Sequence, residues 1–258
     1  SRHPTPQGQD NARTFAQALS AAGLTIVSGL ADGIDGAAHE GALDGAVAAA
    51  LGVAGPGSTI AVVGTGLDRV YPRKHQALAH RIAREGLLIS EFPLGTPPLP
   101  ANFPKRNRIV AGLSRGTLVV EAALQSGSLI TARLAGEMGR EVLAIPGSIH
   151  SPQARGCHAL IKQGAKLVET AQDVLEELNW ATSVPAAGAT LTHLAGDEAG
   201  EGDDALLAAM GFDPVSQDAL SARTGMGPAE LGARLLDLEL SGLVARLPGL
   251  LFQRLTRA

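Results

Sequence analysis

The 258-residue sequence predicts an α/β protein: a doubly wound, mostly parallel sheet followed by a small C-terminal winged-helix domain. Short runs of Val, Ile and Leu recur along the first 178 residues without alternating polar positions, as in strands buried on both faces of a sheet. Longer segments with helical spacing of apolar residues separate these runs, which is the order of right-handed βαβ units. The 32 glycines and the aromatic content of only 3% suit a protein with many tight turns between strands and helices.

The predicted elements follow one another in a regular order. The strands are five apolar runs: Leu24–Ser28, Thr59–Val63, Leu87–Ser90, Thr117–Val120 and Glu141–Ile145. The helices fill the intervals: Gln9–Ala22, Ile34–Leu51, Arg73–Glu85, Arg106–Leu113, Leu129–Met138 and Cys157–Gln163. Leu167–Glu169 is a further short strand, and Ala171–Leu178 closes the first domain, residues 1–178, as a helix.

Residues 179–204 separate the two predicted domains. They contain five acidic residues, no Lys or Arg and no sustained periodicity, which predicts an acidic flexible linker. Residues 1–178 contain 16 Lys and Arg against 15 Asp and Glu. The net charge of −4 therefore arises in the linker and does not argue against an anion-binding first domain.

Residues 205–258 have the pattern of a winged helix. Three helical segments come first: Ala205–Met210, Ser216–Thr224 and Pro228–Ser241. A strand, a turn and a second strand follow within residues 242–253. The third helix, the expected DNA reader, carries three acidic residues and one Arg: Glu230, Arg234, Asp237 and Glu239. DNA binding needs net positive charge facing the phosphates, and this helix does not supply it. The sequence therefore leaves three roles open for this domain: contact with DNA, contact with protein, or a role that has been lost.

Composition restricts the function. The single cysteine, Cys157, excludes an internal disulfide framework and a multi-thiolate metal site. The His, Asp and Glu residues lack metal-ligand spacing, and no serine lies in a Gly-x-Ser-x-Gly motif, so we expect neither a metal nor a hydrolase triad. Without an apolar run of 18 residues or a signal peptide, we expect a cytoplasmic protein that does not contact membranes. The chain begins at Ser1 with no Met, so we expect an upstream part to be missing.

The densest charge lies in residues 102–108, Asn-Phe-Pro-Lys-Arg-Asn-Arg. Arg106 and Arg108 do not share a helical face, so together with Lys105 they surround the predicted helix start. Pro104 precedes that helix and is expected to leave backbone amides free beside the cations. A solvated helix face is the plain alternative, but the arrangement favours an anion site.

Two turns between a strand and a helix are candidate phosphate sites. Ser28-Gly29 begins one of them, and Ser126-Gly127-Ser128 begins the other. Small residues let backbone amides approach a phosphate, and a helix N-terminus adds partial positive charge. In the first turn, Asp35 is an alternative ligand of those amides, as a helix cap. A third turn, Gly64-Thr65-Gly66, lacks the remaining features of a dinucleotide fingerprint, so no nicotinamide cofactor is expected.

Four single residues have competing interpretations. Glu121 ends a predicted strand, and it positions a sugar hydroxyl, acts in catalysis or accepts bonds from local amides, of which the last is commonest. Phe103 packs in the core or stacks on a base. His39 is expected to be packed or capping rather than catalytic, and Cys157 is not expected to be a nucleophile.

In order and spacing, these motifs resemble the DNA processing protein A (DprA/Smf) family over residues 1 to about 178. The matching segments are Ser28–Asp35 with Ala38-His39, Thr59–Asp68 with Tyr71-Pro72, Phe103–Arg108, Glu121-Ala122 with Ser126–Thr131, Gly139–Val142 with Pro146-Gly147, and Leu160-Ile161 with Gly164-Ala165. Ser1-Arg2 fits the end of a Gly-Ser-Arg element of that family.

The resemblance implies an extended Rossmann fold and a non-enzymatic, cytoplasmic homodimer without a cofactor. Such proteins bind single-stranded DNA in natural transformation (competence) and recombination, protect the incoming strand and help load RecA. By position, Arg2, Lys105, Arg106 and Arg108 would hold phosphates; Ser28, Gly29, Ser126, Gly127 and Ser128 would contribute amides and hydroxyls; and Phe103 and Asn107 would line a base or sugar pocket. The dimer and RecA surfaces would lie near Cys157–Gln163, and the winged helix occurs in part of the family.

Two other functions remain open on the residues alone. A Rossmann enzyme that cleaves nucleoside monophosphates would use Glu121 and one Arg, and would not need Lys105, Arg106 and Arg108 together. A transcription regulator would use the first domain as a sensor and the winged helix as its DNA reader.

Overall fold

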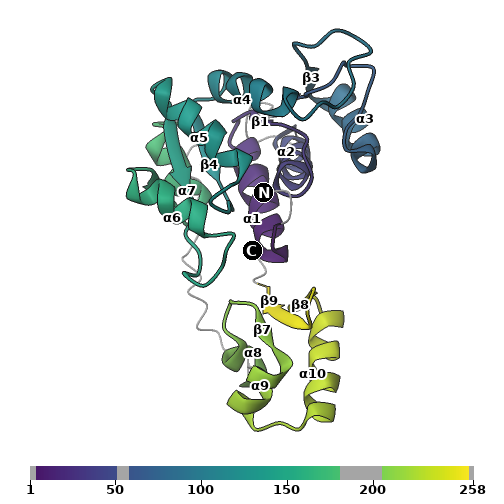
Figure 1. Cartoon of the computed structure of the whole chain (residues 1–258), viewed down its shortest axis with the longest axis vertical. Coiled ribbons are helices and arrows are strands. Elements are labelled where there is room, and N and C mark those ends of the chain that lie inside the picture. The colour runs from purple at the N-terminus through teal and green to yellow at the C-terminus, as the bar shows by residue number, and fades with distance from the viewer. Residues whose placement is uncertain (1–3, 51–57, 181–204, 256–258) are drawn as a thin grey trace. The chain divides into compact units, whose positions relative to one another are not determined.

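The chain folds into two units, within residues 1–184 and residues 185–258 (Figure 1). The computed structural model describes residues 4–50, 58–180 and 205–255. Arg2 and residues 181–204 of the predicted linker lie outside the described residues.

Parallel strands form the centre of the N-terminal unit. One sheet has the order β1-β2-β3, with β1 Ile26–Ser28, β2 Thr59–Val62 and β3 Leu87–Ile89. The other has the order β4-β5-β6, with β4 Gly116–Val119, β5 Glu141–Ala144 and β6 Lys166–Leu167. Every neighbouring pair is parallel; Ser28 pairs with Ala61, and Leu118 with Leu143. The predicted doubly wound α/β class is confirmed, and hydrogen bonding divides its strands into two sheets.

A cavity of about 1180 Å³ lies between the two sheets. Consecutive residues of both edge strands line it, Thr25–Gly29 around β1 and Gly116–Glu121 around β4. Successive side chains of a strand point to opposite faces, so a cavity on one face of a sheet would be lined by every second residue. Here every residue of these stretches lines the cavity, which means that the backbone edges of β1 and β4 border it. The cavity extends to the carboxyl ends of both strands, the place where open α/β sheets bind their ligands.

Seven helices and one 3₁₀ turn are described in this unit: α1 Pro6–Ala21, α2 Ile34–Ala50, η1 Arg73–His75, α3 Gln76–Glu85, α4 Asn102–Leu113, α5 Gly127–Glu137, α6 Arg155–Lys162 and α7 Ala171–Glu177. Figure 1 shows α1 and α2 side by side. A Cβ at Gly41 would lie 2.1 Å from the carbonyl oxygen of Arg13, and one at Gly45 would lie 2.2 Å from that of Gln17. Glycine at both positions therefore permits the close contact of the two helices.

The start of α4 differs from the prediction. The helix begins at Asn102, four residues before the predicted start at Arg106, so Pro104 lies inside its first turn. Proline is tolerated there because a residue of the first turn needs no N–H for the helix. The expectation of free amides beside the cations is therefore wrong: the amides of Lys105, Arg106 and Arg108 lie beyond the first three residues of the helix, where N–H groups bond to carbonyl oxygens one turn back.

The C-terminal unit is a winged helix, as predicted. Its elements are α8 Ala205–Met210, β7 Val215–Ser216, α9 Gln217–Thr224, α10 Pro228–Leu240, β8 Val244–Leu247 and β9 Leu251–Arg254. The strands form an antiparallel sheet in the order β7-β9-β8. Ser216 caps α9 by accepting a hydrogen bond from the Ala219 amide at 3.2 Å.

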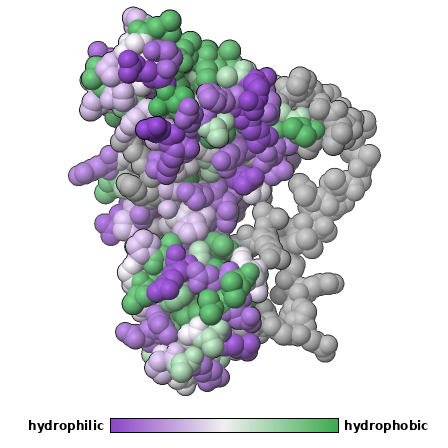
Figure 2. All heavy atoms as spheres, turned by 90° about the vertical axis from the view of Figure 1, so that its right-hand side faces the viewer, coloured by the Kyte–Doolittle hydropathy of each residue, from purple (hydrophilic) through white to green (hydrophobic). Residues whose placement is uncertain are grey.

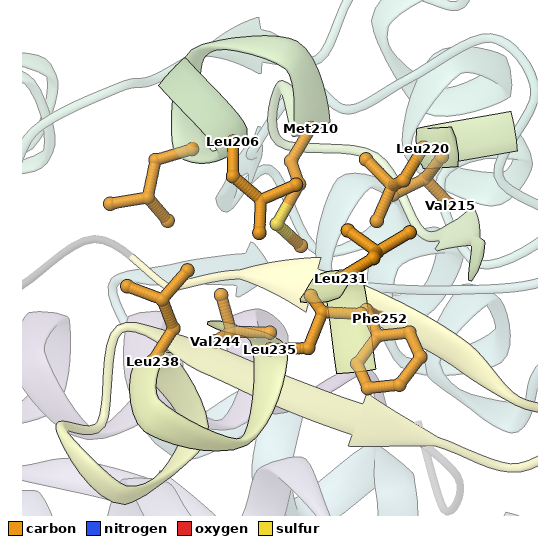
Figure 3. Close-up of a cluster of buried hydrophobic side chains, with 10 residues drawn as sticks. Leu206, Met210, Val215, Leu220, Leu231, Leu235, Leu238, Val244 and Phe252 are labelled. Carbon is orange, nitrogen blue, oxygen red and sulfur yellow. The ribbon is translucent and has the colours of Figure 1, made fainter. Parts of the chain in front are cut away.

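The core of this unit joins all three of its helices to the sheet. Figure 3 shows Leu206 and Met210 of α8, Leu220 of α9, and Leu231 of α10 pointing toward one another, with Phe252 of β9 beside them. Buried leucines recur on α10 at helical spacing: Leu231, Leu235 and Leu238. The outward face of this helix is also apolar in part, since Leu236 is 56% and Leu240 80% exposed.

The surface of the N-terminal unit carries apolar as well as polar residues. Figure 2 shows hydrophobic residues gathered toward the upper end of this unit on the face in view, above a largely hydrophilic area. Exposed apolar side chains of this unit include Leu67, Tyr71, Leu94 and Leu99. No helix within the described ranges has the length and apolar content needed to cross a bilayer.

Candidate nucleic-acid interface

Most of the predicted site residues meet at the carboxyl ends of β1 and β4. The cavity there is lined by Ser28, Gly29, Phe103, Arg106, Asn107, Ser126, Gly127 and Ser128. The three remaining predicted residues are not among these. Lys105 and Arg108 do not line the cavity, and Arg2 lies outside the described residues.

The N-terminus of α5 opens toward this cavity. Ser126 caps the helix, its Oγ accepting a hydrogen bond from the Ser128 amide at 3.3 Å and lying 3.2 Å from the Ser128 hydroxyl. A Cβ built on Gly127 would have no atom within 4 Å, so the space above the first turn is open. Asn107 of α4 approaches from the side, with Nδ2 3.5 Å from the Gly127 carbonyl oxygen. Hydroxyls, an amide side chain and the positive end of a helix dipole thus converge, a combination suited to an anion.

The turn between β1 and α2 is arranged around Asp35. Its Oδ2 accepts hydrogen bonds from the Gly29 amide at 3.1 Å and from the Ala31 amide at 3.2 Å. His75 of η1 supports the turn, with Nδ1 3.1 Å from the Leu30 carbonyl oxygen. The alternative interpretation of Asp35 as a cap is the one observed, so a phosphate at the Gly29 amide would compete with a carboxylate already bound there.

Arg106 is buried. Only 4% of the residue is exposed, and its Nη1 donates a hydrogen bond to the Val62 carbonyl oxygen at the end of β2. The guanidinium lies against Gly29. Because a buried guanidinium is costly to desolvate, this cation is a structural part of the cavity wall, and an anion reaches it only through the cavity.

Lys105 and Arg108 lie on the outer side of α4. They are three residues apart, so they are neighbours on one helical face. Both are exposed, and Arg108 pairs with Glu91. Within the part of the chain that the structure describes, Lys105 forms no ion pair. The structure therefore separates the predicted cluster into one buried cation at the cavity and two exposed cations beside it.

The Glu121 carboxylate is bound to the start of α1. Its Oε1 accepts a hydrogen bond from the Thr5 hydroxyl at 2.5 Å and its Oε2 one from the Thr5 amide at 3.0 Å. Thr5 in turn caps α1, since its hydroxyl oxygen accepts from the Gly8 amide at 3.0 Å. Burial raises the pKa of Glu121, and the bonds from Thr5 act in the opposite direction. Of its three predicted roles, the structure shows the acceptance of hydrogen bonds, but the donors belong to Thr5, 116 positions away in the chain, and are not local amides.

Tyr71 is an aromatic residue of the site that the sequence analysis did not assign. Its ring centroid lies 5.5 Å from that of Phe103, with 39° between the ring planes. Both rings line the cavity, and Tyr71 is 48% exposed whereas Phe103 is half-buried. Two signals pointed to it: Tyr71-Pro72 belongs to a segment that matches the family, and this single tyrosine of the chain stands three residues before Lys74, in a second cluster of cations.

His39 and Cys157 are both buried, and packing is one of the two roles expected of His39. The Nδ1 atom of His39 lies 2.6 Å from the Thr59 hydroxyl, and burial lowers the pKa of its imidazole to about 4. Burial raises the pKa of the Cys157 thiol to about 11, which keeps it protonated and unreactive at neutral pH. Both side chains belong to the packing of the N-terminal unit.

Comparison with known proteins gives matches over both units. Residues 1–179 match the family model for DNA recombination-mediator protein A, and residues 183–249 match the DprA winged helix domain. Protein Smf of Escherichia coli K12 is 44% identical over 252 residues, covering 94% of this chain and 63% of that protein. DNA processing protein DprA of Streptococcus pneumoniae is 48% identical over 180 residues, covering 70% of this chain and 60% of that protein.

Two solved structures of such proteins resemble the N-terminal unit. The X-ray structure of DprA from Streptococcus pneumoniae superposes with a TM-score of 0.61 at 48% identity, covering 69% of this chain and 59% of that one. DNA processing protein A from Helicobacter pylori, whose structure is described for its single-stranded DNA binding mode, superposes with a TM-score of 0.60 at 31% identity, covering 69% of this chain and 77% of that one.

The chain spans 60–63% of the length of the Smf and DprA relatives compared by sequence. Its extended Rossmann-type unit and its winged helix each match the corresponding domain model of one family. By these matches, the chain belongs to the DNA recombination-mediator protein A (DprA) family.

Proposed function

We propose that this chain is a non-enzymatic, cytoplasmic protein that binds single-stranded DNA in natural transformation (competence) and recombination. It protects the incoming strand and helps load RecA onto it, working as a homodimer. Membership of the DprA family supports this role, as does the single-stranded DNA binding mode described for the Helicobacter pylori relative. Residues 1–178 bind the DNA, residues 179–204 are an acidic linker, and residues 205–258 form the winged helix.

One observation carries the proposal: the start of α5, one face of α4 and the β1–α2 turn converge on a single cavity at the strand ends. Two exposed cations lie on α4 next to it. A cavity with cations beside it suits a strand of DNA, because the phosphates bind to cations and backbone amides while the bases bind in a pocket lined by side chains. We assign Lys105, Arg106 and Arg108, with Arg2, to phosphates; Ser28, Gly29, Ser126, Gly127 and Ser128 to amide and hydroxyl contacts; and Phe103 and Asn107 to a base or sugar.

Hydrolysis of a nucleoside monophosphate is disfavoured by the position of Glu121. Glu121 lines the cavity, but both oxygens of its carboxylate already accept hydrogen bonds from Thr5, so the group anchors α1 and would have to give up these bonds to act on a substrate sugar. Release of free base from AMP, lost in Glu121→Gln, would establish the enzyme instead.

Fluorescence anisotropy with labelled oligo-dT and the matching duplex, across a salt series, tests the proposed function. We expect preference for the single strand and a steep salt dependence, with log K falling by roughly 0.7 per neutralised phosphate for each log unit of salt. Equal or stronger duplex binding would favour a winged-helix regulator. Failure to bind either DNA would contradict the proposal.

Deletion of residues 205–258 separates the two DNA-binding models. We expect the remaining unit to keep most of its affinity for single strands, because every residue assigned to DNA contact lies within residues 1–178. A transcription regulator would lose DNA binding on this deletion. The acidic residues of α10, exposed at Glu230 and Asp237, favour the first outcome.

A further inference from the structure

We propose that Tyr71 is the residue on which a DNA base stacks at this interface, and that Phe103 holds its ring in place. This role rests on the proposed single-strand binding. It states which group binds at this part of the cavity wall, namely an unpaired nucleobase. Tyr71-Pro72 is one of the segments that match the family, but neither that match nor the cation cluster gives Tyr71 a role in binding.

The packing of the two rings assigns them different tasks. The Phe103 ring lies on the backbone of Gly64, where a Cβ would come within 2.9 Å of Cδ1, and it touches Tyr71 with 5.5 Å between ring centroids. Phe103 is thus covered by the protein on both of these sides. Tyr71 is 48% exposed at the cavity, so its ring is the aromatic surface that an entering base meets.

The surroundings of Tyr71 suit a planar, polar-edged ligand. The cavity that Tyr71 lines also contains apolar residues, including Pro98, Pro100 and Pro104. Asn107 lines the same cavity and follows Phe103 by one helical turn, so it offers an amide donor and acceptor to the edge of a base. Stacking on an aromatic ring is tolerant of sequence, because every base has a π-face.

Cations stand on both sides of Tyr71 in the chain. Arg73 is exposed, and Arg69 lies 3.7 Å from Asp68 with half of its side chain exposed. Lys74 is held by Asp32 at 2.6 Å. An aromatic side chain flanked by Arg69 and Arg73 complements a nucleotide, whose base is likewise flanked by phosphates. In a duplex the bases are already stacked and paired, so this contact is available to single strands alone.

Affinity for oligo-dT and for an abasic oligonucleotide of equal length tests the role of Tyr71. The two ligands carry the same phosphates and differ in the bases. We expect Tyr71→Ala to weaken oligo-dT binding by about 5- to 150-fold, the equivalent of one stacked base, and to leave abasic binding unchanged. Tyr71→Phe retains the ring and should bind like the unsubstituted protein. Leu94→Ala, which truncates a 74% exposed apolar side chain outside the cavity lining, should change neither affinity.

The outcomes distinguish a failure of the role of Tyr71 from a failure of the proposed single-stranded DNA binding. If the unsubstituted protein does not bind oligo-dT, the proposed function fails. If it binds and Tyr71→Ala binds equally well, only the role of Tyr71 fails. Equal weakening of oligo-dT and abasic binding also overturns that role, since the residue would then act on the fold or on the phosphates.

A fluorescent reporter gives a direct readout of stacking. The chain has one tryptophan, Trp180, so Tyr71→Trp combined with Trp180→Phe leaves a single indole, at position 71. Excited beyond the absorption of thymine, this indole should be quenched by oligo-dT and not by the abasic strand. Unchanged fluorescence on saturation with oligo-dT would contradict stacking at position 71.

Discussion

The Arg106 guanidinium lies directly on Gly29, with no side chain between the cation and the β1–α2 turn. A Cβ on Gly29 would stand 1.9 Å from Nη1 and 2.4 Å from Cζ of that arginine. The same Nη1 atom donates to the Val62 carbonyl oxygen. The absence of a side chain at Gly29 therefore creates the space in which α4 places a cation at the ends of β1 and β2.

Gly29→Ala should displace Arg106. The added methyl group cannot coexist with the present guanidinium position, so we expect a loss of about 1–3 kcal/mol in the free energy of unfolding. Single-strand affinity should fall with it, because the cavity wall moves. Urea unfolding and oligo-dT anisotropy measure the two effects.

Gly112→Ala is the control for this change. It lies near the end of α4, where a Cβ would meet only the Met138 Sδ at 3.7 Å. We expect unchanged affinity and a gain in stability of up to about 1 kcal/mol, since alanine is the better helix former. Equal stability of Gly29→Ala and the unsubstituted protein would show that Arg106 is not held against the turn.

Arg106→Ala should weaken the binding of all single-stranded sequences. We expect the salt dependence to flatten by about one phosphate contact. Because Arg106 is only 4% exposed, stability should fall too, and binding must be compared under conditions in which unfolding curves show both proteins folded. Unchanged affinity and slope would remove Arg106 from the DNA site.

Lys105→Ala and Arg108→Ala should each reduce affinity and salt slope without a comparable loss of stability. Both side chains are exposed, and substitutions at such positions usually change stability by less than about 0.5 kcal/mol. Arg84→Ala removes the same charge from an exposed position on α3 and serves as the control. If all three variants lose affinity equally, net charge rather than the outer face of α4 is responsible.

Glu121→Gln should destabilise the N-terminal unit. Its carboxylate accepts two hydrogen bonds from Thr5, whereas an amide offers one oxygen and turns an N–H toward the other donor. We expect a loss of about 1–3 kcal/mol, measured by urea unfolding. Glu137→Gln, at an exposed pair with Arg133, should change stability far less. Similar values for the two variants would argue against the anchoring role of Glu121.

His39 should make stability depend on pH in mildly acidic solution. Burial, with charge from His75 and Arg106, lowers the pKa of the folded-state imidazole to about 4 from its usual 6.5, while Asp35 acts in the opposite direction. Between these values the unfolded chain binds the proton and the folded protein does not. The contribution of His39 is therefore complete above about pH 6.5 and is lost as the pH falls toward about 4, by up to about 3 kcal/mol.

His39→Asn isolates this effect. The Thr59 hydroxyl donates its hydrogen to the Ile26 carbonyl oxygen at 2.8 Å, so it must accept a hydrogen bond from residue 39. Asparagine at position 39 keeps an N–H donor for this bond. Glu121 has the opposite sign, because its pKa is raised and its contribution falls as the pH rises. Glu121 contributes the same pH dependence to both proteins, so it cancels when the unfolding free energy of His39→Asn is subtracted from that of the unsubstituted protein. We would follow this difference from about pH 7 to about pH 5. A difference that does not change with pH would contradict the prediction.

Local patterns predicted the order of most elements, but they missed the two-residue strand β7, Val215–Ser216, whose Ser216 was assigned to the following helix. Apolar runs predicted β2 and β5 to within one residue at each end, and helical spacing predicted α8 at its observed bounds. These signals are local, since they depend on which side chains recur along a few turns or pleats. The start of α4 was misplaced because Pro104 ends most helices but is accepted in a first turn, and only the contacts around Asn102 decide between the two.

The sequence by itself determined most of the elements, the two-domain order, the family motifs and the residues that carry charge near the cavity. The tertiary structure alone decided what each of those residues touches. It buried Arg106 against Gly29 while leaving Lys105 exposed, and it joined Tyr71 to Phe103. It also brought Thr5 to Glu121 across 116 positions of the chain. Periodicity shows that a side chain lies on one face of its helix or strand, but burial, desolvation and hydrogen-bond partners come from segments distant in sequence that pack against that face.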